Sequence, residues 1–129
     1  MRRVLILLTG LILAVVMTAC STHPAPARGT VSGVFVGVGG PVPVNGHTAR
    51  PIPLSGRIVA ISSAGQRVQV KVGRGGKFTL SLRPGTYRLL GYNPAVAAGA
   101  SGMECGALHP VRVGAGTATA HVEVTCAFQ

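Results

Sequence analysis

The stretch GKFTLSLRPGTYRL, residues 76–89, decides the fold class. In its first half, apolar residues alternate with polar ones, and Phe78, Leu80 and Leu82 share one parity. Strict alternation over a short run is typical of a strand with one buried face. We therefore predict a strand over Lys77–Leu82 that contributes these three side chains to a core.

The second half of the same stretch predicts a turn followed by another strand. Pro84 has its φ fixed by its ring, and Gly85 accommodates the positive φ that a type II turn requires. Tyr87 then lies just after the turn. We expect its ring to be buried and its hydroxyl to bond nearby backbone, as in the tyrosine corner of sandwich folds.

Working outward, other short runs with a period of two lie between clusters of Gly, Pro and Ser. They predict strands over 30–38, 57–62, 66–72, 110–113 and 117–126, in addition to the two above. The stretches 39–53 and 93–107 are predicted as loops. Because no apolar repeat at helical spacing follows residue 20, we predict an all-β fold, a small Greek-key β-sandwich of about seven strands.

Side-chain parity gives each predicted strand a buried and an exposed face. In 66–72 the valines face the core, and Arg67 and Lys71 face solvent. In 117–126 the buried parity is that of Ala118, Ala120, Val122, Val124 and Cys126.

The spacing Gly-x-Phe followed by Leu-x-Pro-Gly-x-Tyr, at residues 76–87, resembles the repeat of carboxypeptidase-regulatory-like and transthyretin-like domains. The resemblance extends to the strand at 31–35 and the hairpin at 57–72. It implies a β-sandwich that supports, presents or binds, and it implies no particular chemistry.

The N-terminus has the features of a signal peptide. Two arginines precede an apolar run at 4–17, which is shorter than the roughly 20 residues of a membrane-spanning helix. The sequence Met17-Thr18-Ala19-Cys20 resembles the lipobox of bacterial lipoproteins. That resemblance implies cleavage before Cys20 and lipidation of this cysteine; the alternatives are a plain secreted protein and an uncleaved anchor.

These features divide the chain into three parts. Residues 1–19 are the predicted signal peptide, residues 20–29 a lipidated tether rich in Pro and Ala, and residues 30–129 the β domain. The domain is then attached to the cell membrane on its extracytoplasmic side. The tail, from Cys105 to Cys126, is also similar to small actinobacterial lipoproteins of unassigned role.

Of the three cysteines, the lipobox resemblance assigns Cys20 to the anchor. Cys105 and Cys126 are left as a pair in an oxidising compartment, where a disulfide is expected. A bond closing a loop of this size contributes about 3 kcal/mol. The alternative, a reactive thiol or metal-ligand pair, lacks a matching pair of histidines.

The chain carries a net charge of +10, from 12 Lys and Arg against 2 acids. Without the two arginines of the signal peptide the charge is +8 (10 minus 2). Such a charge attracts polyanions, but the compartment and the lack of aromatic residues clustered among the basic ones disfavour nucleic acid. We predict contact with anionic lipids or cell-wall polymers through Arg67, Lys71, Lys77 and Arg83, the alternative being a solvated basic surface without a specific partner.

Catalysis is disfavoured by the residue inventory. There is no aspartate, and no nucleophile elbow surrounds any serine. The 4 histidines are scattered, although His109 and His121 flank the last predicted turn. We therefore predict a non-catalytic envelope lipoprotein, structural or accessory, without cofactor or metal. The alternative is an extracytoplasmic binding protein for a small or polymeric anionic ligand.

Overall fold

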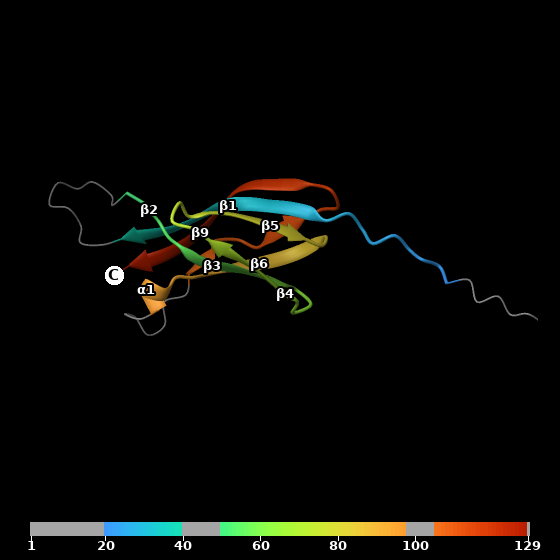
Figure 1. Ribbon diagram of the computed structural model, residues 1–129, viewed down its shortest axis with the longest axis horizontal. Helices are drawn as coiled ribbons and strands as arrows, with labels where there is room; N and C mark the ends of the chain where they lie inside the picture. Colours follow the sequence, from blue (N-terminus) through green and yellow to red (C-terminus); the bar gives the residue numbers. More distant parts are fainter. Residues whose placement is uncertain (1–19, 40–49, 98–104, 129) are drawn as a thin grey trace, which may run out of the picture.

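The computed structural model describes residues 20–39, 50–97 and 105–128 (Figure 1). Nine strands and one helical turn follow a strandless N-terminal tether: β1 (Gly29–Gly39), β2 (Ile52–Pro53), β3 (Gly56–Ser62), β4 (Arg67–Val72), β5 (Lys77–Leu82), β6 (Gly85–Tyr92), α1 (Pro94–Ala97), β7 (Cys105–Ala107), β8 (Val111–Val113) and β9 (Ala118–Phe128). The predicted all-β fold is confirmed. The signal peptide lies outside the described residues.

The strands form one continuous sheet that curls around the core. Its order is β2-β1-β9-β7-β6-β3-β4, with β5 also paired to β1 and β8 also paired to β6. β4 and β5 are consecutive in the chain, yet β4 pairs with β3 and β5 pairs with β1. The short turn between them therefore joins the two edges of the curled sheet. Figure 1 shows the tether leaving the domain at the end opposite α1 and the C-terminus.

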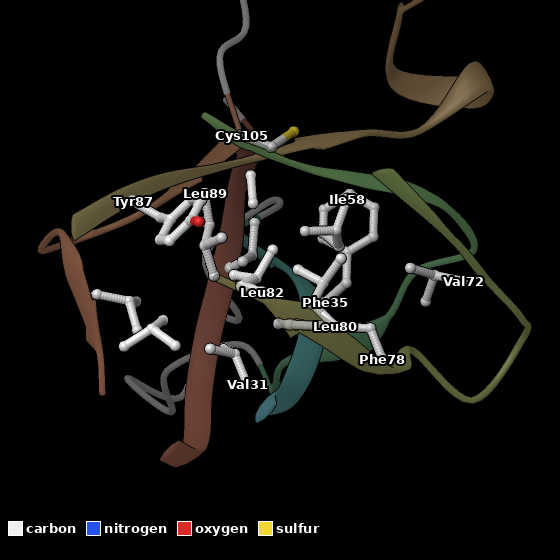
Figure 2. Packing of buried hydrophobic residues seen from close by; sticks show 14 of the residues in the cluster. Val31, Phe35, Ile58, Val72, Phe78, Leu80, Leu82, Tyr87, Leu89 and Cys105 are labelled. Carbon is white, nitrogen blue, oxygen red and sulfur yellow. The ribbon is translucent and has the colours of Figure 1, made fainter. Parts of the chain in front are cut away.

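The core lies inside this curl and is built from the predicted alternation (Figure 2). On β5, Phe78, Leu80 and Leu82 are buried while the intervening residues are exposed. On β4, Val72 is buried and the other two valines are partly buried against the same cluster. Both strands follow their predicted parity because each has the core on one side only.

The corner between β5 and β6 differs from the predicted turn. Gly85 has a φ of 155°, far from the roughly 80° of the second central residue in a type II turn. The two strands do not pair, because the chain crosses here from β1 to the half of the sheet that contains β3. The predicted tyrosine corner is confirmed: Tyr87 is 3% exposed, and its hydroxyl donates to the Arg83 carbonyl oxygen at 2.8 Å.

The parity predicted for the last strand is wrong in its first half. β1 and β9 pair in parallel. Val31 faces Thr119 and Gly33 faces Val122, so between these two pairs β9 contains one residue more than β1. At this β-bulge His121 has a φ of 61°, a left-handed conformation in which histidine is one of the more frequent residues. The extra residue reverses the parity, so Ala118 and Ala120 are exposed.

Two predicted loops contain short elements. The stretch 93–107 contains α1 and β7, and β2 lies at the end of the stretch 39–53. Residues 40–49 and 98–104 lie outside the described part of the chain. α1 begins with a capping residue, because Asn93 Oδ1 accepts a hydrogen bond from the Ala95 amide at 2.9 Å, and Pro94 occupies the first helical position.

Candidate functional site

The outer surface of the sheet over β3, β4 and β6 is basic. Strand register places Lys71 and Tyr92 on either side of Arg57, and Arg67 and Arg88 on either side of Ile61. Alternate residues of a strand share a face, so these side chains all lie on the side of the sheet away from the core. We call Arg57, Arg67, Lys71 and Arg88 the basic face.

Apolar side chains lie between the cations of the basic face. Val59 lies between the row that contains Arg57 and the row that contains Arg67 and Arg88. It is opposite Gln69 on β4 and Leu90 on β6, and only 8% of it is exposed. A hollow of about 330 Å³ above it is lined by Arg57, Arg67, Gln69 and Tyr92. Long cationic side chains cover apolar surface with their methylene groups while the charge stays in water. The face therefore combines exposed charge with an apolar floor.

One end of the basic face, farthest from the tether, contains a larger hollow of about 640 Å³. We call it the distal hollow, and its lining residues are Gly56, Arg57, Gln69, Val70, Lys71, Tyr92, Asn93 and Pro94. The guanidinium carbon of Arg57 lies 4.9 Å from the centroid of the Tyr92 ring. This is a cation–π contact, which holds the guanidinium against the ring.

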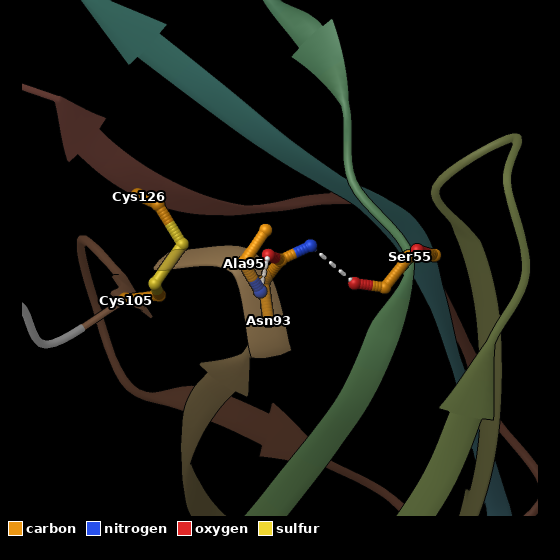
Figure 3. The surroundings of a disulfide bond; sticks show 5 residues. All are labelled: Ser55, Asn93, Ala95, Cys105 and Cys126. Atoms are coloured by element: carbon orange, nitrogen blue, oxygen red, sulfur yellow. Dashed lines mark hydrogen bonds between the residues drawn. A yellow bond between two sulfur atoms is a disulfide. The ribbon is translucent and has the colours of Figure 1, made fainter. Parts of the chain in front are cut away.

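The wall of the distal hollow is fixed by Asn93. This residue is 7% exposed, and its Nδ2 donates to the Ser55 carbonyl oxygen at 2.7 Å. Together with the bond that caps α1, it joins the start of β3 to the end of β6, as Figure 3 shows. Gly56, next to Ser55, is needed there because a Cβ would stand 2.0 Å from the Tyr92 carbonyl oxygen.

The tether end of the domain, next to Arg67, also contains several arginines. Arg28 donates to the Ser81 hydroxyl at 3.1 Å and to the Ser81 carbonyl oxygen at 3.0 Å, which fixes the last residue before β1. With Arg67 and Arg83 it lines an open hollow of about 410 Å³. The buried Tyr87 also lines this tether-end hollow.

The predicted contact residues are therefore only partly together. Arg67 and Lys71 lie on the basic face, and Arg83 lies beside Arg67 in the tether-end hollow. Lys77 does not belong with them: it pairs with Val34 on the other half of the sheet, and it lines a separate hollow with Glu123. The grouping was wrong for Lys77 because β4 and β5 follow each other in sequence but lie on opposite edges.

Three further residues of this surface, Arg57, Arg88 and Tyr92, were not predicted from the sequence. Arg57 is followed by the uninterrupted apolar run 58–61, which hides the parity of β3. A signal was present in the predicted hairpin, whose short turn between 62 and 66 places residue 57 opposite residue 71. The pairing of Arg57 with Tyr92 had no such signal, because it depends on the distant contact between β3 and β6.

The predicted disulfide is present in the structure. Cys105 on β7 is bonded to Cys126 on β9 (Figure 3). Both residues are buried, and the burial of Cys126 agrees with the parity of β9 after the bulge. Cys20, at the start of the tether, is exposed and forms no disulfide; its lipidation stays a prediction.

Among residues 20–39, 50–97 and 105–128, no group of three or more His, Cys, Asp or Glu side chains is placed to hold a metal ion. The same part of the chain contains no helix with the length and hydropathy needed to cross a bilayer. No protein-family model matches the sequence, and no curated protein matches it either. The resemblances to lipoproteins and to carboxypeptidase-regulatory-like domains therefore rest on the quoted motifs alone.

Proposed function

We propose that the protein is a non-catalytic, lipid-anchored module of the cell envelope, on the extracytoplasmic side of the membrane, whose basic face binds an anionic cell-wall polymer. The observation that carries this proposal is the charge of one sheet surface. Four cations, Arg57, Arg67, Lys71 and Arg88, share it. The only acid in the described part of the chain, Glu123, lies on β9 in the other half of the sheet.

This arrangement of cations does not stabilise the fold. Arg57 and Lys71 are directly opposite each other on neighbouring strands, where like charges destabilise a sheet. No described acid lies on this face to offset the repulsion. A polyanion lying across the face would supply the missing countercharge, and it would gain from all four cations together.

The direction of the basic face favours a linear polymer over a bilayer. Arg67 and Lys71 are four residues apart on β4, about 13 Å at 3.3 Å per residue, with Arg67 toward the tether end and Lys71 at the distal hollow. A flat bilayer at the tether end would meet Arg28, Arg67 and Arg83 and leave Lys71 and Arg57 out of reach. A chain of anionic units can follow the whole face.

One feature supports the lipid anchor, and a second supports the extracytoplasmic location. The motif Met17-Thr18-Ala19-Cys20 precedes a tether that leaves one end of the domain (Figure 1). The Cys105–Cys126 disulfide is typical of an oxidising, extracytoplasmic compartment. Fully extended, residues 20–28 reach at most about 30 Å, which is long enough to hold the basic face away from the membrane surface.

Binding of purified acidic wall polymer to the full chain in detergent tests the proposal. We expect binding that weakens steeply from low to high salt, since exposed charges about 10 Å apart are screened at 0.1 M. The double variant Arg67→Glu/Lys71→Glu should lose affinity by about tenfold or more, equivalent to about 1.4 kcal/mol. The matched control Arg74→Glu/Lys77→Glu makes the same change in net charge outside the basic face and should retain affinity.

Equal losses in the two double variants would contradict a dedicated face, since only net charge would then matter. Binding to phosphatidylglycerol vesicles without binding to polymer would make the membrane surface the partner and overturn the polymer proposal.

A further inference from the structure

We infer that the distal hollow binds a single sugar unit carrying a carboxylate or phosphate group. This inference rests on the proposed function, because such a unit is the repeating element that an acidic wall polymer presents. It goes further because it assigns recognition of one sugar unit to the distal hollow. The other cations of the basic face then attract the rest of the polymer.

The anionic group is assigned to the pair Arg57 and Lys71. Both line the distal hollow, and strand register places them directly opposite each other. The β-carbons of such a pair are about 5 Å apart, so one carboxylate or phosphate reaches both side chains. Arg57 is held over Tyr92, which restricts the guanidinium before any ligand arrives and leaves its N–H edges available for a two-point hydrogen bond.

The ring of the sugar is assigned to the surface beside these cations. Tyr92 is 41% exposed, and Pro94 extends its apolar surface at the edge of the hollow. The apolar face of a pyranose ring fits against such a surface. The amide of Gln69, also in the lining, offers both a donor and an acceptor to hydroxyl groups.

The size and rigidity of the hollow agree with this ligand. Its volume of about 640 Å³ lies within the 300–1,000 Å³ usual for small-molecule sites. The Asn93 bonds to Ser55 and Ala95 fix one wall. The neighbouring part of β6, at Gly91, pairs with Cys105, which the disulfide joins to β9. Little of the site therefore has to be ordered on binding, which lowers the entropic cost of association.

Isothermal titration of the full chain in detergent with four probes tests the inference. Glucuronic acid and glucose 1-phosphate should bind, glucose should not, and inorganic phosphate should bind at least tenfold more weakly than glucose 1-phosphate. Arg57→Gln and Tyr92→Leu should each lower the affinity for both sugar acids by about tenfold, or about 1.4 kcal/mol. Arg74→Gln, which removes a cation from the exposed turn between β4 and β5, is the matched control and should bind as the unaltered chain does.

Each result has a defined meaning. Equal affinity for inorganic phosphate and glucose 1-phosphate would overturn the role of the ring surface. Binding of wall polymer without binding of either sugar acid would overturn this inference and leave the proposed function standing; loss of both would overturn both. A melting temperature of Tyr92→Leu close to that of the unaltered chain keeps the variant informative. Displacement of a bound sugar acid by wall polymer would identify the polymer as the natural source, and failure to displace it would identify a free sugar acid.

Discussion

The two tyrosines of the chain lie on the same strand and have opposite surroundings. Tyr87, near the tether end of β6, is 3% exposed, whereas Tyr92, at the far end, is 41% exposed. They are five positions apart, an odd number, so the pleat directs one ring into the core and the other onto the basic face. Each also contacts an arginine, but Tyr87 does so through the Arg83 carbonyl oxygen and Tyr92 through the charged Arg57 side chain.

This difference separates a residue that maintains the fold from one that is available to a partner. The hydroxyl of Tyr87 is used inside the protein, where it fixes the corner between β5 and β6. Tyr92 contributes a ring face and a stacked cation to an open hollow. At the tether end, Tyr87 and Arg28 are held by hydrogen bonds within the chain, whereas the ring of Tyr92 at the distal end is open to a ligand.

The largest expected effect concerns the lipid anchor proposed at the tether end. In Cys20→Ala, acylation should be lost completely, because no other cysteine follows the signal sequence at the required position. The protein should then be released or accumulate as an unprocessed precursor. Mass spectrometry of the unaltered protein provides the check: if residue 20 carries no acyl mass, the lipid-anchor proposal is wrong.

The next largest effect should distinguish the two rings directly. Tyr87→Ala removes a buried aromatic side chain and should lower the free energy of unfolding by about 3–5 kcal/mol. Tyr92→Ala, its matched control on the same strand, should cost about 1 kcal/mol or less, because its ring is already partly in water. Urea denaturation followed by circular dichroism measures both. Similar losses in the two variants would show that Tyr92 has a structural role like that of Tyr87.

A smaller effect is expected at the distal end when the disulfide is removed. Replacing Cys105 and Cys126 together by Ser should cost about 3 kcal/mol, since the bond closes a loop of 21 residues. The melting temperature should fall in the same way when the unaltered chain is reduced. Because β7 borders β6 close to the distal hollow, the affinity for sugar acids should also fall. An unchanged melting temperature after complete reduction would contradict this account.

How much could be predicted from the sequence depended on the strand. β4 and β5 followed their alternation because each contacts the core with one face. β9 did not, since its bulge is centred on His121 rather than on a glycine that would have marked it. β2 and β7 are too short, at 2 and 3 residues, for any periodicity. The tyrosine corner could be predicted because its hydrogen bond spans only four residues.

Less of the candidate site could be predicted from the sequence, because the site depends on pairing between strands that are distant in the chain. Arg67 and Lys71 were found because they share a strand. The remaining parts of the basic face come together through the pairing of β3 with β6, whose partners Arg57 and Tyr92 are 35 positions apart. Local periodicity predicts which face of the sheet a side chain lies on. It does not predict which residue lies beside it on a strand that is distant in sequence.

The parallel pairing of β1 with β9 has a consequence for the order in which the fold is completed. β9 lies between β1 and β7 in the sheet, so the two halves cannot be joined until Ala118–Phe128 has been synthesised. Contacts this distant in sequence carry a large loop-closure cost and form late. Until β9 is present, the curled sheet stays open between β1 and β7. It can close only when its last strand is available.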